Sequence, residues 1–145
     1  MKLRDKLRGL LSIKDSPHKV AMSFAVGVFF GISPLIGLHT ILALISAWLF
    51  RLNRLATIVG VYITNPWSII PIYTFCTWVG ALLIGTDRVI PNIDWSHITL
   101  SSLVSELKFL LLPFVIGTIV VGVVSSVLSY FIIKKAIEKN RGKQV

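Results

Sequence analysis

The chain has 145 residues, of which 54% are hydrophobic and only 14% are charged, and its formal net charge is +9. Soluble domains carry about a quarter charged residues. This chain is too poor in charge to cover its own surface with polar groups, and we predict a single integral membrane domain. The basic residues gather at the two ends of the chain. That placement argues against a nucleic-acid partner and predicts that the ends bind anionic lipids of the bilayer.

Leucines recur at helical spacing through residues 2–13, and basic side chains occupy the rest of that helical surface. The pattern is typical of an amphipathic helix. We predict that residues 1–15 form a basic helix that lies in the interface of an anionic leaflet. The alternative is a solvated helix that packs on the rest of the protein.

Three dipeptides predict the starts of helices. Ser and Asn side chains accept hydrogen bonds from the free N–H groups of a helix N-terminus, and Pro suits the first helical position. A proline in the middle of a helix would instead kink it. The three dipeptides are Ser16-Pro17, Ser33-Pro34 and Asn65-Pro66.

The first apolar arm, residues 17–50, is interrupted at Ser33-Pro34. Each of its two pieces has about 16 residues and a length of roughly 24 Å, which is less than the ~30 Å hydrocarbon core. Basic residues flank both ends of the arm, and flanks of this kind stay in the cytoplasm. We therefore predict a re-entrant helical hairpin, followed by a cytoplasmic hinge that contains Arg51, Asn53 and Arg54. The competing topology has three plain crossings.

The second arm, residues 55–85, is interrupted at Asn65-Pro66 and predicts a broken transmembrane helix. Residues 86–112 are the least apolar part of the middle of the chain and predict a periplasmic or interfacial segment. Residues 113–133 are uncharged and begin with proline, and their helical length of about 31 Å matches the hydrocarbon core. We predict a transmembrane helix there, with residues 136–145 as a basic cytoplasmic tail. Both termini are then cytoplasmic.

Two pairs of small residues in the last helix have four-residue spacing, which lets helix backbones approach closely in lipid. Packing within one chain and self-association both remain open for these pairs, Gly122 with Ser126 and Ser125 with Ser129. We predict a homo-oligomer, because one helical bundle of this size can hardly enclose a transport pathway across the membrane.

The polar residues that enter the apolar arms gather at the two breaks. Helix N-termini at both breaks would present free N–H groups and the positive end of a helix dipole. Two such ends that meet in a membrane cavity favour an anionic group. We predict a substrate site at Ser33, Pro34, Gly37, His39, Thr40, Asn65, Pro66 and Trp67. The simpler interpretation is that these residues only cap and bend helices.

The sequence shows no catalytic constellation, phosphate-binding loop or metal-ligand cluster, and no acidic residue lies inside the apolar arms. We predict no enzymatic activity, no cofactor and no metal. Carboxylates in the membrane are the usual parts of proton relays, so a proton-relay pump is disfavoured as well.

One ordered set of segments resembles a bacterial membrane family catalogued as domain of unknown function 2062. The segments are Gly-Val-Phe-Phe-Gly-Ile-Ser-Pro-Leu-Ile-Gly-Leu-His-Thr (27–40), Arg-Leu-Asn (51–53) and Thr-Asn-Pro (64–66). The resemblance covers roughly residues 17–135 and implies a protein of the bacterial cytoplasmic membrane. The positions that match the family's motif are Gly27, Gly31, Pro34, Gly37, His39, Asn53, Asn65 and Pro66.

These observations predict an all-α integral membrane protein, a small bundle with broken or re-entrant helices. The first functional hypothesis is a transport-type protein, a permease, channel or lipid translocator, with an anion or lipid-phosphate site where the broken helices meet. The alternative is a membrane scaffold or assembly partner that does not transport. Because some members of the resembling family carry glycosyltransferase-like domains, the scaffold would serve envelope or glycan biogenesis.

Overall fold

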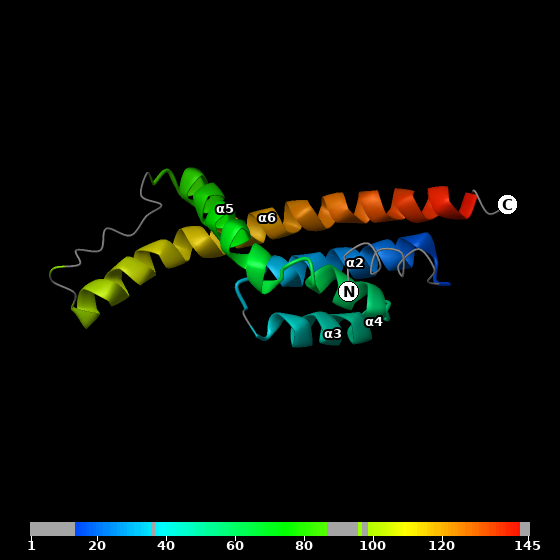
Figure 1. Ribbon diagram of the computed structural model, residues 1–145, viewed down its shortest axis with the longest axis horizontal. Helices are drawn as coiled ribbons and strands as arrows, with labels where there is room; N and C mark the ends of the chain where they lie inside the picture. The colour runs from blue at the N-terminus through cyan, green and yellow to red at the C-terminus, as the bar shows by residue number, and fades with distance from the viewer. Residues whose placement is uncertain (1–13, 36, 87–95, 97–98, 143–145) are drawn as a thin grey trace.

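The computed structural model describes residues 14–35, 37–86, 96 and 99–142 (Figure 1). Within these ranges the chain is helical and contains no strand, so the predicted all-α class is confirmed there. The predicted amphipathic helix and most of residues 86–98 lie outside the described residues. The helices are α2 (Pro17–Ile32), α3 (His39–Leu49), α4 (Arg54–Val61), α5 (Pro66–Ile84) and α6 (Leu100–Gly142).

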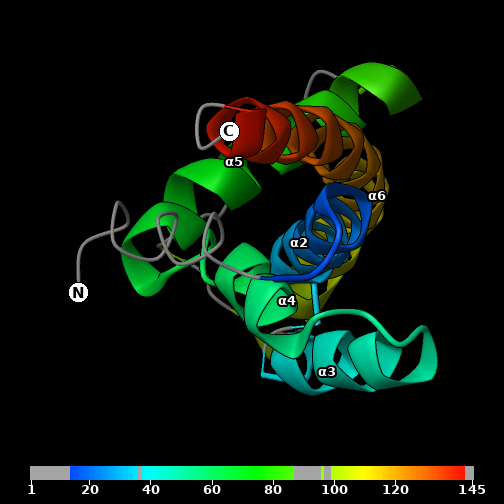
Figure 2. The ribbon, with the colours of Figure 1, turned by 90° about the vertical axis from the view of Figure 1, so that its right-hand side faces the viewer.

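Helix α2 is the centre of the fold. It packs along the C-terminal half of α6 on one side and against α3 and α4 on the other (Figures 1 and 2). After α2 the chain turns back, so α2 and α3 lie side by side in the part of the sequence where a hairpin is predicted. The core lies between α2 and its neighbours and includes Val20, Phe24, Val28, Ile133 and Ile137.

Two of the three predicted helix starts are confirmed. Ser16 caps α2, because its hydroxyl accepts a hydrogen bond of 3.3 Å from the backbone N–H of Lys19. Asn65 caps α5 through a reciprocal capping box with Ser68, a device that satisfies two otherwise free N–H groups.

The third predicted start, at Ser33-Pro34, is wrong. Ser33 ends α2 instead, and its extended backbone (ψ 149°) is the conformation that a following proline imposes. The Ser33 hydroxyl donates to the Phe30 carbonyl oxygen at 2.8 Å. Helix α3 begins only at His39, after Gly37 has turned the chain with a φ of +88°.

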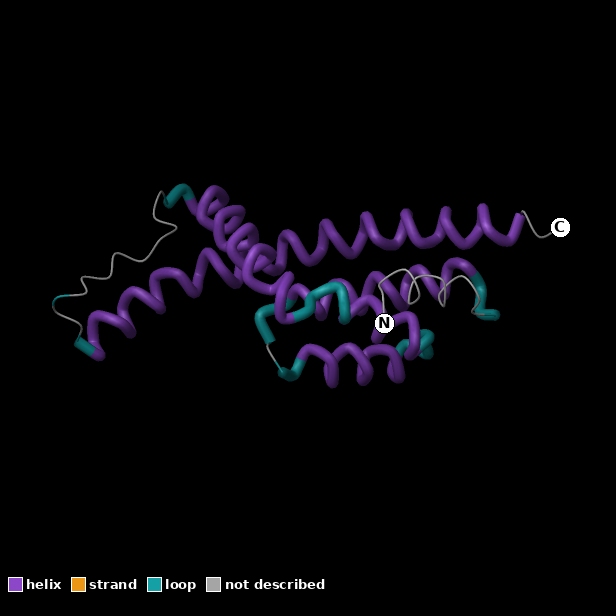
Figure 3. Tube along the Cα trace, in the orientation of Figure 1, coloured by secondary structure: helices purple, strands orange, loops and turns teal. Residues whose placement is uncertain are grey.

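The sequence predicts that a helix begins at Pro113, and this prediction is also wrong. Pro113 lies inside α6, a helix of 43 residues that also includes most of the predicted basic tail. An internal proline leaves the carbonyl four residues earlier without its helical partner and bends the helix. Figures 1 and 3 show α6 bending where α5 crosses it. Pro113 is buried at this crossing, where a Cβ on Gly80 would overlap its carbonyl oxygen.

Glycines set the distance between the helices at two crossings. At the crossing of α2 and α4, a Cβ on Gly27 would lie 3.0 Å from Gly60 Cα and would overlap the Thr57 carbonyl oxygen. At the crossing of α5 and α6, a Cβ on Gly117 would overlap the Cys76 carbonyl oxygen and one on Gly80 would overlap that of Pro113. Backbones this close are typical of helix pairs that use small residues in place of bulky side chains.

One of the two pairs of small residues in the last helix, Gly122 with Ser126, packs within the chain. Ser126 donates its hydroxyl hydrogen bond to the Ala25 carbonyl oxygen of α2 at 2.8 Å, and Gly122 faces the ring of Phe29. These contacts favour the intramolecular alternative for Gly122 and Ser126.

Large apolar side chains cover much of the outer surface of the longer helices. α5 and α6 are long and apolar enough to cross a membrane, and only 17% and 22% of their most apolar stretches are buried within the chain. The exposed side chains include Trp67, Ile70, Phe75, Leu82, Leu107, Leu111, Val124, Leu128 and Ile132.

Candidate functional site

The two breaks of the apolar arms lie next to each other. The Tyr73 hydroxyl of α5 donates a hydrogen bond of 3.1 Å to the Ser33 carbonyl oxygen, at the end of α2. A Cβ on Gly31 would lie only 2.6 Å from Thr64 Oγ1, just before α5. The structure therefore brings the first and second break together, although neither contact uses an N–H group of a helix N-terminus.

At the first break, the predicted site residues make local contacts. Pro34 is half-buried in the turn that follows α2. His39 Nδ1 accepts a hydrogen bond of 3.3 Å from the backbone N–H of Gly37, and it lies 3.2 Å from the Leu35 carbonyl oxygen. Thr40 is half-buried in the first turn of α3. His39 thus helps to shape the turn between α2 and α3.

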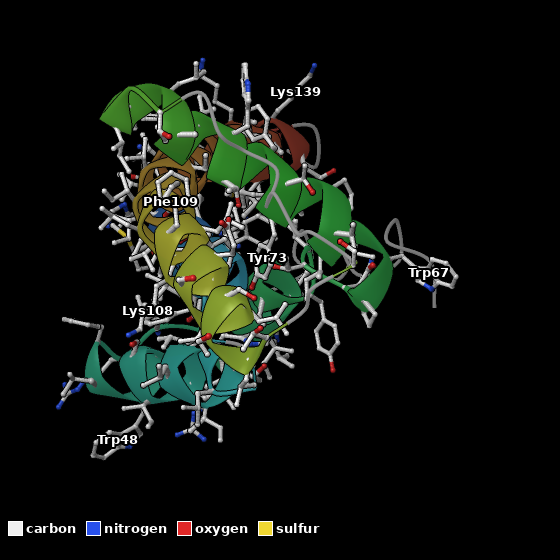
Figure 4. All side chains as sticks on the ribbon, turned by 90° about the vertical axis from the view of Figure 1, so that its left-hand side faces the viewer. Trp48, Trp67, Tyr73, Lys108, Phe109 and Lys139 are labelled. Atoms are coloured by element: carbon white, nitrogen blue, oxygen red, sulfur yellow. The ribbon has the colours of Figure 1, made fainter. Side chains whose placement is uncertain are left out.

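At the second break, the chain itself caps the start of α5. The side-chain oxygen of Asn65 accepts from the N–H groups of Trp67 and Ser68, both at 3.0 Å. Ser68 Oγ in turn accepts from the Asn65 N–H at 2.9 Å and donates to the Ile63 carbonyl oxygen at 3.0 Å. Trp67 is 92% exposed and points away from the other helices (Figure 4).

The predicted pair of converging helix N-termini is therefore wrong. Pro34 begins no helix, and at Pro66 two of the first N–H groups are already bonded to the Asn65 side chain. Serine and asparagine stand before a proline in both places, but the local sequence does not reveal whether that proline opens a helix or follows its end. Nearby breaks remain, without the two dipoles that would attract an anion.

A surface groove of about 490 Å³ runs between α5 and the N-terminal half of α6, next to the breaks. Tyr73 connects the groove with the first break. Its hydroxyl donates to the Ser33 carbonyl oxygen, and its ring lies edge-on to that of Phe114 with 5.0 Å between the ring centroids. The groove is lined by Ile69, Ile70, Tyr73, Thr74, Thr77, Leu107, Leu110, Leu111 and Phe114.

The hydroxyl hydrogens along the groove are already donated to the backbone. Thr74 Oγ1 donates to the Ile70 carbonyl oxygen and Thr77 Oγ1 to that of Tyr73, each at 2.8 Å. Hydroxyls bonded in this way present little demand for a polar ligand. The surface that the groove offers is therefore mainly apolar.

Sequence reasoning missed this groove. Tyr73 and Thr77 of α5 are four residues apart and therefore lie on the same helix face, so the sequence could have indicated one wall of the groove. The opposite wall, from Leu107 to Phe114, spans the boundary at Pro113 that separates two predicted segments.

A polar network joins three remote parts of the chain at the end of the molecule where α6 finishes. Asn53 donates a side-chain hydrogen bond of 2.7 Å to the Asp15 carboxylate, and its backbone N–H donates to Ser23 Oγ at 2.8 Å. Arg141 donates to the Asp15 carbonyl oxygen at 2.6 Å. Asn53 also caps α4 by accepting from the Ala56 N–H at 3.1 Å.

The network stabilises the ionised form of Asp15. The hydrogen bond from Asn53 lowers the pKa of the Asp15 carboxyl, and the nearby ammonium group of Lys19, 3.4 Å away, lowers it further. Burial raises the pKa of this carboxyl, but by less than the hydrogen bond from Asn53 lowers it. The start of α2, the start of α4 and the last turn of α6 are thus held together beside basic side chains.

No three His, Cys, Asp or Glu side chains gather closely enough to hold a metal ion among the residues that the structure describes. The three residues of the predicted hinge differ in exposure. Asn53 is half-buried in the network, whereas Arg51 and Arg54 are exposed.

Comparison with known proteins gives one match. The family of uncharacterized proteins conserved in bacteria, DUF2062, matches residues 2–145. No curated protein and no solved structure matches the chain. The predicted resemblance is confirmed over nearly the whole length of the sequence, and the chain belongs to the DUF2062 family of bacterial proteins.

Proposed function

We propose that this protein is a lipid translocator of the bacterial cytoplasmic membrane, in which the groove between α5 and α6 holds the apolar chain of a lipid. The observation that carries the proposal is the apolar groove itself, whose threonine hydroxyls are bonded to the backbone. A water-soluble ion or solute needs polar groups that replace its hydration. A lipid chain needs only apolar surface, so among transport functions the groove favours a lipid.

The exposed apolar surfaces of α5 and α6 support membrane integration. Monomeric soluble proteins rarely expose large contiguous apolar patches, whereas most of the apolar stretches of both helices are unburied here. Helix α5, at 19 residues, is about 28 Å long, which is close to the hydrocarbon thickness. On this proposal lipid covers these surfaces, except where a second copy of the chain packs in the homo-oligomer.

The position of the basic residues supports an orientation with the C-terminus in the cytoplasm. The start of α2, the hinge between α3 and α4, and the end of α6 gather at one end of the molecule (Figures 1 and 2). Basic residues near membrane helices favour the cytoplasmic side. A re-entrant α2–α3 hairpin is the topology that places both of its ends on that side.

Cysteine labelling tests the orientation. In a Cys76→Ser background, single cysteines replace Arg51, Lys139 and Ser101, the last at the opposite end of α6. With a membrane-impermeant thiol reagent, we expect Ser101→Cys to react in intact cells and the other two only after the cells are opened. Reaction of Arg51→Cys in intact cells would show that the first arm crosses the membrane and would exclude the re-entrant hairpin.

Obstruction of the groove tests lipid translocation. The variant Thr74→Phe places a ring in the groove from an exposed position, and Leu83→Phe adds a ring to an exposed position of α5 outside it. In proteoliposomes with a fluorescent phospholipid, the wild-type protein is expected to accelerate exchange between leaflets. We expect Thr74→Phe to reduce that acceleration about tenfold, a loss of about 1.4 kcal/mol, and Leu83→Phe to retain it.

If the wild-type protein does not accelerate exchange, the translocator proposal fails and the membrane scaffold becomes the better explanation. If Thr74→Phe and Leu83→Phe exchange lipid equally fast, lipid passes elsewhere and the groove is not the pathway.

A further inference from the structure

The turn between α3 and α4 forms a cleft of about 420 Å³ at the basic end of the molecule. Its polar wall consists of Arg51 and Arg54, and Trp48, which is 67% exposed, provides an aromatic wall on the outer side of α3 (Figure 4). From this arrangement we infer that the cleft binds the phosphate group of an anionic ligand through the two guanidinium groups. The inference does not rest on the groove between α5 and α6.

Arg51 occupies a backbone position that ordinarily belongs to glycine. Its φ is +52°, and it is the only non-glycine residue with positive φ in the described chain. The Leu52 N–H donates to the Ala47 carbonyl oxygen at 2.8 Å, which closes the end of α3. Glycine is the usual residue at this left-handed position, because a side chain there costs about 1 kcal/mol. The side chain of Arg51 is therefore present despite a local conformational cost.

The charge of Arg54 is also unfavourable at its position in the chain. It is the first residue of α4, where the helix dipole is positive and a cation is unfavourable. Neither guanidinium forms an ion pair or hydrogen bond with another residue that the structure describes. Departures from local preference are expected where a site has a function. Two of them occur here in one cleft.

The chemistry of the cleft selects phosphate. Guanidinium groups bind phosphate oxygens with two parallel hydrogen bonds. A tryptophan at this place suits the headgroup level of a membrane. The phosphate could belong to a lipid headgroup or to free inorganic phosphate, and both present the same oxygens to the arginines.

Binding to the purified protein in detergent tests the inference. The probes are short-chain phosphatidic acid, diacylglycerol with the same chains and no phosphate, and inorganic phosphate. The variants are Arg51→Gly and Arg54→Gln, and Lys139→Gln is the control, because it removes one charge from the same end of the molecule at an exposed position of α6. Unfolding temperature is measured for every variant.

We expect the wild-type protein to bind phosphatidic acid at least tenfold more tightly than diacylglycerol. Each arginine variant should lose about tenfold in affinity for phosphatidic acid, whereas Lys139→Gln should stay within about twofold. Neither arginine variant should lower the unfolding temperature, because glycine suits the positive φ and removal of a cation suits the start of a helix. Thus loss of binding is separated from loss of folding.

Inorganic phosphate identifies the source of the ligand. If it competes with phosphatidic acid at millimolar concentration, the cleft accepts free phosphate, and if it does not, the cleft needs a lipid headgroup; both results support the inference. Equal binding of the two lipids would overturn it, because only the chains would then be recognised. An equal loss in Lys139→Gln would also overturn it, because the attraction would come from the whole basic end.

Discussion

Replacement of Gly117 by alanine is expected to separate α5 from α6 and to destabilise the protein. An added Cβ would overlap the Cys76 carbonyl oxygen and would lie 3.0 Å from the Gly80 backbone nitrogen. Backbone atoms cannot rotate away as side chains do, so the two helices must move apart. Overpacking of this kind costs about 1–3 kcal/mol and occasionally more. We expect about 3 kcal/mol, measured as the free energy of unfolding in detergent.

Gly122→Ala is the matched control in the same helix. A Cβ there would lie 3.4 Å from Phe29 Cδ2, which is ordinary contact with a side chain. Alanine favours a helix over glycine by up to about 1 kcal/mol, so Gly122→Ala should be neutral or stabilising. Equal stability of Gly117→Ala and the wild-type protein would show that α5 and α6 do not approach as closely as described. The separation of α5 and α6 in Gly117→Ala should also reshape the groove, since both helices form its walls.

Replacement of Asn53 by alanine is expected to lower the free energy of unfolding by about 2.5 kcal/mol. The change removes the cap of α4, which is worth about 1 kcal/mol, and the hydrogen bond to the Asp15 carboxylate. Bonds to charged groups contribute about 1.5–3 kcal/mol, and the lower end applies because Asp15 is only half-buried. Thermal or denaturant-induced unfolding measures the difference.

The variant Asn53→Asp should keep the cap but lose stability in a pH-dependent way, because it places a second carboxylate beside Asp15. In the wild-type protein the pKa of Asp15 is lowered, so its stabilising effect is present above the unfolded pKa and is lost as pH falls through the folded one. In the variant, repulsion raises the pKa values of the pair, so the penalty is full near pH 7 and disappears on acidification. The difference in stability between the two proteins should narrow as the pH falls.

The substitution Asp15→Asn, combined with Asn53→Asp, provides the control for the repulsion between the two carboxylates. In that background, Asn53→Asp no longer meets a negative charge, so most of its penalty at pH 7 should disappear. An interaction energy near zero between the two substitutions would contradict the contact between these side chains, because independent sites give additive effects.

The sequence by itself determined the helical class, the family and two of the three predicted helix starts. Those features depend on local chemistry. A chain with so few charges must be largely apolar on its surface, and a serine or asparagine before a proline can cap a helix with its own side chain. Ser16 and Asn65 do so, with bonds to N–H groups two or three residues away. The family is encoded in the order of short segments such as residues 27–40.

Local chemistry was insufficient at Ser33 and at Pro113. Ser33 can cap either end of a helix, and its role depends on the turn at Gly37, where positive φ delays the start of α3. Pro113 ends a helix by its own preference. Inside α6 it is buried against α5, at a crossing where glycines allow backbone contact, so tertiary packing outweighs that preference.

Only the tertiary structure decided which distant residues form the sites. The groove requires the crossing of α5 and α6, and the network of Asn53 requires Asp15 and Arg141, which are 38 and 88 positions away from it in the sequence. A sequence pattern describes neighbours along the chain, whereas these contacts arise because α2 packs between α6 and the α3–α4 pair. The cleft of Arg51 and Arg54 is intermediate: the sequence shows its charges, and only the fold shows that Arg51 adopts the left-handed backbone of a glycine.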